Sequence, residues 1–264
     1  MFHRVHIATL ICLLFLSACA TAGPTRNTYD EAVQRAFAEA EEALEDGDYL
    51  DATSRYQAIK ARFPYTKYAA LAELRLGDAY FDQEKFPLAI SQYRSFLKLH
   101  PNHEKSVYAH FRIAESYVGQ MPDDWFLLPP GHEKDLAKTR DALREVNLFL
   151  RRFPESDQVE EAKSMSQKAR RQLADHEFYV ATFYLDRGKP EAAAMRLTYL
   201  LENYQGVGLD PNALFLLARA YLELGDVDKA KEALGDLIEF FPTHEFAEDA
   251  RTYLAEKLGA TDSI

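Results

Sequence analysis

The sequence predicts an all-α fold in which pairs of helices repeat along the chain and stack into a solenoid. The first observation is a period of 37 residues, which aligns Tyr56 with Tyr93 and Leu197 with Leu234. The second is a recurring small residue in the preceding helix, which allows two neighbouring helices to approach closely. The third is the composition: 47% of the 264 residues are hydrophobic, and only 11 are Gly and 11 are Pro, so the chain can bury a sizeable core.

The small residue recurs in five units, and in four of them a tyrosine follows three residues later. The five small residues are Ala40, Gly77, Ala114, Ala181 and Ala218. The tyrosine fills the gap beside the small residue, and proline ends the second helix because it cannot continue one. These columns resemble the tetratricopeptide repeat. We therefore predict a tetratricopeptide-repeat solenoid of five helix pairs plus a C-terminal capping helix.

The N-terminal residues predict export. Residues 1–18 form a secretory signal, because Arg4 precedes an apolar run and small residues follow that run. The run holds ten residues, whereas a helix that crosses a bilayer needs about 20. The last residues of this segment and Cys19 resemble a bacterial lipobox, in which Cys19 becomes the acylated first residue. The alternative is an ordinary cleavable signal with an incidental cysteine.

The residues after the lipobox indicate where the protein is held. Ala20 stands where an Asp would retain a lipoprotein in the inner membrane, so the lipoprotein sorting rule implies the outer membrane. Acyl chains hold a protein at a membrane without a spanning helix. Residues 19–28 then form a flexible, lipidated leader between the membrane and the fold.

One irregularity divides the repeats into two groups. From Pro101 to Pro154 the chain runs 53 residues, which is 16 more than one period. Three prolines and a glycine in residues 121–137 rule out a continuous helix, so this segment is a Pro-rich insertion loop. The N-terminal repeats span 29–120 and the C-terminal repeats span 138–264. The apolar residues that begin at Trp125 either fold back on the repeats or remain available to a partner.

A second irregularity predicts one long helix. The chain has 14 extra residues between Pro154 and Tyr184, which is nearly four helical turns, so an unbroken helix over about 157–185 keeps its packing face in phase. A final helix after Pro242 reaches about Leu258 as the cap, with Ala255 in the small-residue column.

Charge and cysteine content exclude several function classes. The net charge is -11, from 31 Lys plus Arg against 42 Asp plus Glu, so nucleic acid is not the expected partner. Both cysteines lie in the first 19 positions, so no disulfide framework holds the fold. A run from Lys163 to Arg171, including Lys168 and Arg170, is a modest basic patch that serves either as solvated surface or as a partner contact.

No pattern in the sequence predicts catalysis or a cofactor. Nucleophile elbow, phosphate loop, dinucleotide fingerprint and zinc-protease helix are all missing from the sequence, so we expect no enzymatic activity. His100 and His103 flank a turn, and a metal there would need further ligands, so we expect no metal and favour a capping role. The acidic run between Glu39 and Asp48 is expected to be a solvated helix face.

The order of features along the mature chain resembles the BamD family, the lipoproteins of the outer-membrane β-barrel assembly machinery. The most specific string runs from His176-Glu177 through Val180-Ala181 and Phe183-Tyr184 to Arg187-Gly188. The resemblance implies a non-enzymatic scaffold in the outer membrane that faces the periplasm. The partners it implies are a BamA-like barrel protein, bound through its POTRA domain, unfolded outer-membrane proteins, and other lipoproteins of the machinery.

The resemblance also suggests which residues act. Arg196 matches the arginine at the family's BamA-docking surface, and Arg187 belongs to the same surface. The early repeats recognise substrate peptide in the family, and the residues expected there are Phe63, Tyr65, Tyr68, Tyr80, His103 and Tyr108. The tyrosines among them serve either in packing or as peptide anchors. One departure is Gln205-Gly206, which stands where the family has a proline.

Two other functions remain open at this point. The first is a tetratricopeptide-repeat envelope lipoprotein that coordinates peptidoglycan synthesis or cell constriction. The second is a helical solenoid attached to a lytic cell-wall hydrolase, which would need a separate catalytic domain.

Overall fold

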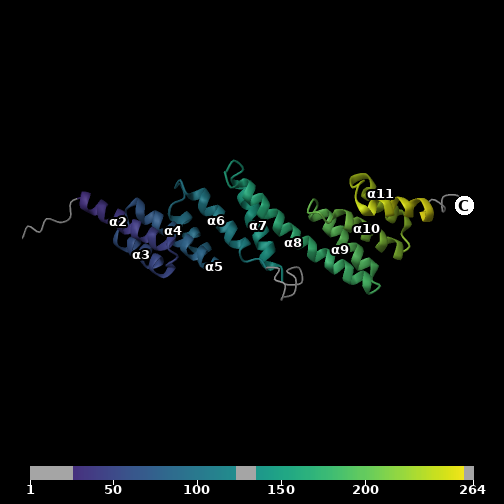
Figure 1. Cartoon of the computed structure of the whole chain (residues 1–264), viewed down its shortest axis with the longest axis horizontal. Coiled ribbons are helices and arrows are strands. Elements are labelled where there is room, and N and C mark those ends of the chain that lie inside the picture. Colours follow the sequence, from purple (N-terminus) through teal and green to yellow (C-terminus); the bar gives the residue numbers. More distant parts are fainter. Residues whose placement is uncertain (1–25, 123–134, 259–264) are drawn as a thin grey trace, which may run out of the picture. The chain divides into compact units, whose positions relative to one another are not determined.

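The computed structural model describes residues 26–122 and 135–258, and these residues form helices with no strand among them (Figure 1). The helices, in chain order, are α2 (Arg26–Glu45), α3 (Tyr49–Arg62), α4 (Lys67–Asp82), α5 (Phe86–Leu99), α6 (Ser106–Val118), α7 (Ala137–Arg152), α8 (Val159–Asp186), α9 (Pro190–Asn203), α10 (Asp210–Glu223), α11 (Val227–Phe240) and α12 (Glu245–Tyr253). Cys19, the signal segment and the apolar residues that begin at Trp125 lie outside the described residues.

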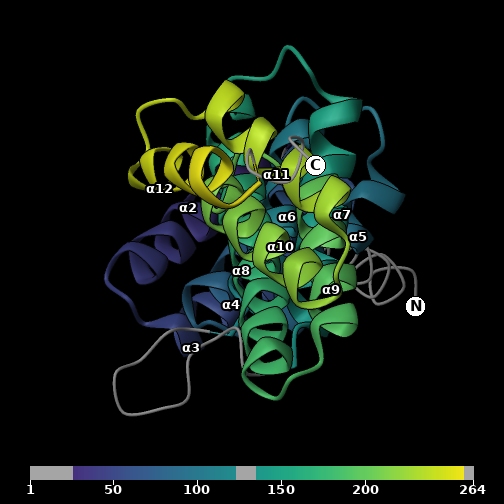
Figure 2. The same cartoon turned by 90° about the vertical axis from the view of Figure 1, so that its right-hand side faces the viewer.

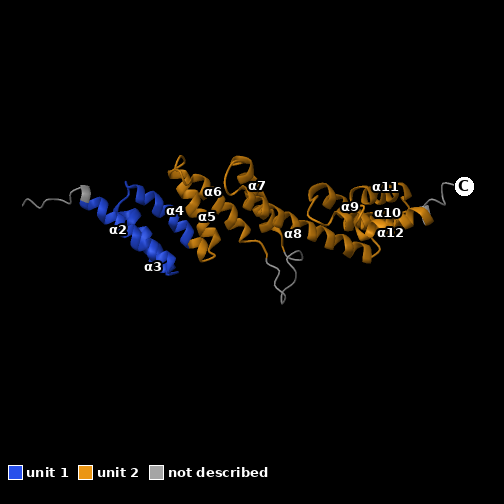
Figure 3. Cartoon of the chain, turned by 45° about the horizontal axis from the view of Figure 1, so that its top comes forward, with its two compact units in different colours: residues 1–79 blue, residues 80–264 orange. Residues whose placement is uncertain are grey.

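The chain divides into two compact units, residues 1–79 and residues 80–264 (Figure 3). In the first unit, α2 begins at Arg26, inside the segment that the sequence assigns to the leader. Asp48 caps α3 by accepting a hydrogen bond from the Asp51 backbone N–H. The core of this unit contains Val33, Ala40, Ala52, Tyr56 and Ile59.

In the second unit each helix packs against the next one in the chain, from α5 and α6 through α11 and α12. The last of these contacts can be followed in Figure 2. The aligned positions of the repeat are buried, including Ala89 and Ala230 in one column and Tyr93 and Leu197 in the next. The predicted tetratricopeptide-repeat solenoid of helix pairs with a capping helix is confirmed.

The predicted long helix is confirmed as α8, which has 28 residues. Ala162 near its start packs in a cluster with α6 and α7, whereas Leu173 and Ala181 pack with α9, α10 and α11. α8 therefore contributes to two core clusters, one shared with α6 and α7 and the other shared with α9, α10 and α11.

The capping helix is α12, and it continues as a π-helical turn from Leu254 to Leu258. Ala247 and Ala250 are its buried small residues, and Phe246 stacks on Phe215 with ring centroids 4.6 Å apart. The prediction for Ala255 is wrong, because this residue is exposed. The wider turn changes which side chains face α11, so the column does not extend past Leu254.

An arginine joins neighbouring repeats at two places related by the 37-residue period. In the first unit, Arg75 donates from Nη2 to Glu41 over 3.0 Å and from Nη1 to Asp78 over 3.1 Å. The buried hydroxyl of Tyr56 donates to the same Glu41 carboxylate. Burial and this neighbouring negative charge raise the pKa of Tyr56.

The second arginine of this kind is Arg112, which is 37 residues after Arg75. Its Nε donates to the Tyr93 hydroxyl over 3.2 Å, and its Nη1 donates to Glu115 over 2.8 Å. Its guanidinium carbon lies 3.6 Å from the centroid of the Phe81 ring. We call the set of Arg112, Tyr93, Glu115 and Phe81 the Arg112 latch, because it joins α5 and α6 to the last residues of α4, all within residues 80–264.

The short turns between paired helices require a left-handed backbone at one position. Gly47, Gly188 and Gly225 occupy it with φ of +76°, +64° and +78°. Glu84 occupies the same position between α4 and α5 with φ of +56°. A side chain makes this conformation unfavourable by about 1–2 kcal/mol, so the turn at Glu84 carries strain that the other turns avoid.

We expect Glu84→Gly to raise the free energy of unfolding by about 1 kcal/mol, since relief of the left-handed strain exceeds the entropy that glycine adds to the unfolded chain. Urea denaturation followed by circular dichroism measures it. Gly225→Ala is the matched control, because a Cβ at this position would meet nothing within 4 Å. The free energy of unfolding of this variant should fall by a similar amount. A Glu84→Gly protein that is less stable than the parent would contradict this account.

Candidate functional site

The hairpin of α8 and α9 carries both arginines that the sequence assigns to docking. Arg196 on α9 donates from Nη1 to Oε2 of Glu177 on α8 over 3.1 Å. The Glu177 side chain is 9% exposed, and that of Arg196 is 46% exposed. Arg196 thus neutralises a buried carboxylate within the chain, while its remaining N–H groups face solvent and can still reach a partner.

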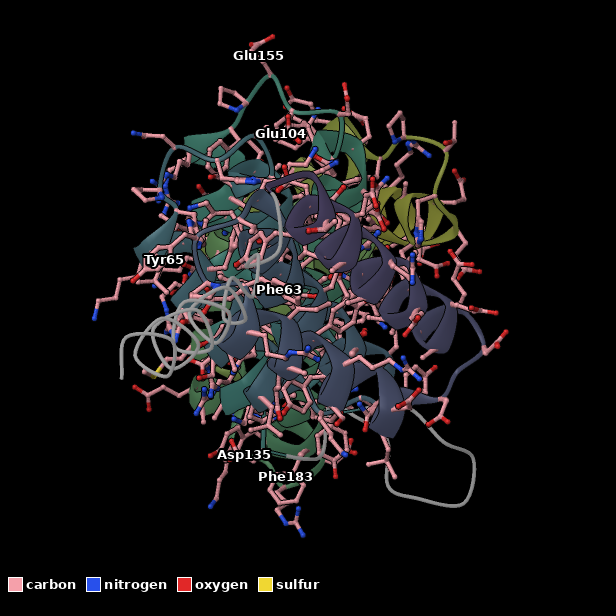
Figure 4. The ribbon with its side chains drawn as sticks, turned by 90° about the vertical axis from the view of Figure 1, so that its left-hand side faces the viewer. Phe63, Tyr65, Glu104, Asp135, Glu155 and Phe183 are labelled. Carbon is pink, nitrogen blue, oxygen red and sulfur yellow. The ribbon has the colours of Figure 1, made fainter. Side chains whose placement is uncertain are left out.

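Arg187 follows α8 directly and lies on the aromatic ring of an exposed phenylalanine. Its guanidinium carbon is 3.6 Å from the centroid of the Phe183 ring. Figure 4 shows the Phe183 side chain pointing away from the helices. The pair presents a cation and an apolar ring together at the end of the hairpin.

Exposed apolar side chains also lie along both helices of this hairpin. Tyr179 and Phe183 are four residues apart on α8, and Met195 and Tyr199 are four residues apart on α9, with exposed fractions between 41% and 71%. Residues four apart lie on the same face of a helix. We call Tyr179, Phe183, Arg187, Met195, Arg196 and Tyr199 the hairpin surface. Exposed apolar groups beside arginine are typical of protein interfaces.

The basic patch on α8 binds another part of the chain. Arg170 donates to the carbonyl of Gln205 over 3.0 Å, and Arg171 donates to that of Val207 over 2.9 Å. Gln167 donates to the carbonyl of Gly206 over 2.9 Å. These bonds hold the loop between α9 and α10, where the family's proline is missing. At these two arginines, therefore, the partner is the protein's own backbone.

A further contact at this loop comes from α10. The Asp210 carboxylate accepts the backbone N–H of Gly206 over 3.1 Å. Lys163, also in the basic patch, pairs instead with Glu160 of its own helix over 2.7 Å. The loop is thus bonded by α8 and α10, and these bonds restrict its backbone where the family's proline would have done so.

The first three residues expected in a peptide groove belong to the first unit and differ in exposure. Phe63 is 7% exposed and packs edge-on against Tyr29 at 5.1 Å between ring centroids, so it is a core residue. Tyr65 is 99% exposed, and Figure 4 shows both residues. Tyr68 packs against Phe37 at 5.3 Å. Of the three, Tyr65 is the side chain that a partner reaches most directly.

The other three expected groove residues belong to the second unit and are partly buried. His103 accepts the backbone N–H of Lys105 at Nδ1 over 3.1 Å and packs against Phe96, so it caps its turn. Tyr108 lies beside Arg112, with 5.8 Å between guanidinium and ring centroid. Tyr80 is also partly buried. The six residues therefore fall on separate units, and no single groove of one unit contains them all.

Several acidic residues expected on a solvated face have partners inside the protein. Glu39 pairs with Arg55 over 2.7 Å, and Glu41 pairs with Arg75.

No group of three or more His, Cys, Asp or Glu in the described ranges is arranged to hold a metal ion. Within those same ranges, no helix combines the length and the apolar character needed to cross a membrane.

Stacked helix pairs with buried small residues at the repeated positions define a tetratricopeptide-repeat protein, which is a non-catalytic kind of protein. The chain belongs to the YfiO family, described as outer membrane lipoprotein, whose model matches residues 29–234. The family match covers both units described above and ends within α11.

Relatives with an assigned role carry the name outer membrane protein assembly factor BamD. The one from Neisseria meningitidis serogroup A is 29% identical, over 88% of this chain and 90% of its own length. The one from Caulobacter vibrioides is 25% identical, over 93% of this chain and 79% of its own length. The one from Vibrio cholerae is 25% identical, over 89% and 98%. These relatives support a role in outer-membrane protein assembly.

Solved structures similar to this chain are tetratricopeptide-repeat proteins. The TPR2AB domain of yeast Sti1 in complex with pHSP90 is 13% identical, with a TM-score of 0.44, and covers 89% of this chain and 95% of that one. TTC0263 from Thermus thermophilus is 17% identical, with a TM-score of 0.34, over 86% and 98%.

Proposed function

We propose that this protein is a non-enzymatic scaffold of the outer-membrane β-barrel assembly machinery, which docks to a BamA-like barrel protein and receives unfolded outer-membrane proteins for insertion. Membership of the family and the role of its relatives support the assembly function. Acylation at Cys19 holds the protein at the outer membrane, facing the periplasm, where other lipoproteins of the machinery can join it.

The hairpin surface is the observation that carries the docking proposal. It combines four exposed apolar side chains with Arg187 and Arg196 on two adjacent helices. Apolar anchors supply most of the free energy of a protein interface, and arginine adds directional bonds to a partner's carboxylates. The POTRA domain of the barrel protein binds here.

Receipt of substrate involves the first unit in this proposal. Tyr65 is fully exposed at the turn between α3 and α4, and Tyr68 lies at the start of α4 beside Lys67. Aromatic side chains are favoured anchors for an extended polypeptide. Phe63 contributes by holding this turn in place from the core rather than by contact with substrate.

We expect Met195→Asp to reduce co-purification of the BamA-like barrel protein by about tenfold or more, because it places an unpaired charge in the apolar part of the interface. The measurement is affinity purification of tagged protein from solubilised membranes. Met195 is 71% exposed and separate from the ion pair between Arg196 and Glu177, so the fold is retained.

Leu50→Asp is the matched control, since Leu50 is 78% exposed on the first unit. This variant should bring down the barrel protein as the parent does. Wild-type recovery with Met195→Asp would overturn the assignment of the hairpin surface. Recovery of peptidoglycan synthases in place of the barrel protein would favour the envelope lipoprotein that coordinates cell-wall synthesis.

A further inference from the structure

We propose that α7 carries a binding site for an acidic segment of a partner polypeptide. The site is built on Arg140, Arg144, Asn147 and Arg151, which follow one another at intervals of four, three and four residues. This spacing places all four on one face of a helix. We call this set the arginine stripe. It shares no residue with the hairpin surface, although Tyr204 beside it packs against Tyr199 of that surface with 5.9 Å between ring centroids.

The arginine stripe lines a shallow, open cavity. The cavity has a volume of about 340 Å³, and the other residues that line it are Leu143, Leu173 and Tyr204. The walls thus alternate guanidinium groups with apolar side chains. Such a lining suits a chain segment that carries both carboxylates and an apolar side chain.

The charge of the arginine stripe is largely unneutralised. Arg144 pairs with Asp141 over 2.8 Å. The side chains of Arg140 and Arg151 form no hydrogen bond or ion pair with any residue of 26–122 or 135–258. Several other arginines of the chain are paired with a carboxylate, for example Arg75, Arg112 and Arg219.

The positive charge of the cavity comes from the arginine stripe itself, because the other residues that line it are neutral. Burial and a hydrogen bond that Tyr204 donates to Tyr199 raise the pKa of Tyr204 to about 12, so this residue stays neutral. The charges of Glu177 and Arg140 act on it in opposite directions. Arg170 donates to the carbonyl of Gln205, the residue after Tyr204. The protein as a whole has a net charge of -11, so a positive hollow is a local exception that selects an acidic partner.

Arginine is the residue type best suited to bidentate recognition of a carboxylate or a phosphate. Its planar fork donates two parallel N–H bonds to one carboxylate, and these bonds are stronger than those between neutral groups. Asn147 lies between the arginines and accepts a hydrogen bond from Ser166 on α8 over 3.1 Å, which fixes this face of α7 against the long helix. The stripe is therefore held in place before any ligand arrives.

The test uses the full-length chain in detergent micelles and a short fluorescein-labelled peptide of alternating glutamate and leucine. We expect saturable binding by fluorescence anisotropy that weakens as salt rises. The double variant Arg140→Glu, Arg151→Glu should weaken binding by about tenfold or more. The double variant Arg140→Lys, Arg151→Lys keeps the charge but loses the fork, so its loss should be smaller.

The matched control is Lys98→Glu, Lys105→Glu, which changes the net charge equally at two exposed residues away from α7. Circular dichroism verifies that each variant is folded. Equal weakening by the control, or no binding of the peptide to the parent, would overturn the proposal. Binding of phosphatidylglycerol vesicles through Arg140 and Arg151, without binding of the peptide, would overturn it in favour of a membrane contact.

Discussion

Replacing Arg112 with alanine is expected to lower the free energy of unfolding of the second unit by about 3 kcal/mol. The Arg112 side chain is 14% exposed, and its loss removes the bonds to Tyr93 and Glu115 together with the contact on the Phe81 ring. Guanidinium chloride denaturation monitored by circular dichroism gives the change.

Two comparisons isolate the cause of this loss. Arg112→Lys keeps a charge but cannot reproduce the planar fork, so about half of the effect should remain. Arg75→Ala is the matched variant one repeat earlier, where the side chain is 40% exposed, and it should lose only about 1 kcal/mol because solvent screens its ion pairs. Equal losses at both positions would contradict the role given to burial.

Acidification should destabilise the second unit through His110. Burial of this imidazole, and then the positive charge of Arg152, lower its pKa to about 4. The unfolded chain therefore takes up a proton near pH 6.5, whereas the folded chain takes it up only near pH 4. The free energy of unfolding falls as pH drops through this window, by about 3 kcal/mol in total, and changes no further from this group below it.

The measurement compares unfolding at pH 7 and pH 4.5 for the parent and for His110→Phe. Phe153 lies 5.1 Å from the His110 ring between centroids, so an aromatic replacement preserves the packing. The variant should lose clearly less stability on acidification than the parent. Identical losses in the two proteins would show that other groups cause the acid sensitivity.

Positions that repeat with a fixed period were readily predicted from the sequence. Ala114 and Ala218 are 1% exposed, and Ala181 is fully buried, as the small-residue column requires. The helix over 157–185 was also predictable, since 14 residues keep a helical face in phase and no Gly or Pro interrupts it. Apolar periodicity reports the core because burial selects the same residue sizes in every unit.

Polar contacts between repeats were missed for a different reason. Arg75 and Arg112 are related by the same period as Tyr56 and Tyr93, and comparison of the charged positions would have found them. The bonds from Arg170 and Arg171 to a loop more than 30 residues away could not have been found in this way. They depend on where a non-repeating backbone places its carbonyl groups.

The candidate site was predicted only in part. Arg187 and Arg196 were identified by resemblance, but the exposed side chains of Tyr179 and Met195 beside them were not. From sequence alone, an apolar residue on a helix is expected to lie in the core. Whether Tyr179 is buried depends on which helices pack around α8, and the 28-residue length of α8 changes that set of helices. The exposure of these side chains therefore became known only from the packing of the helices in the structure.

The continuity of α8 has a mechanical consequence. At 1.5 Å per residue, the 28 residues of α8 make a helix about 42 Å long. One end of this helix packs against α6 and α7, and the other packs against α9 and α10. A rod seated at both ends does not flex at a hinge between them. α7 and α9 therefore pack on one uninterrupted helix, so the spacing between the residues of α7 and those of α9 is set by the length of α8 rather than by a flexible linker.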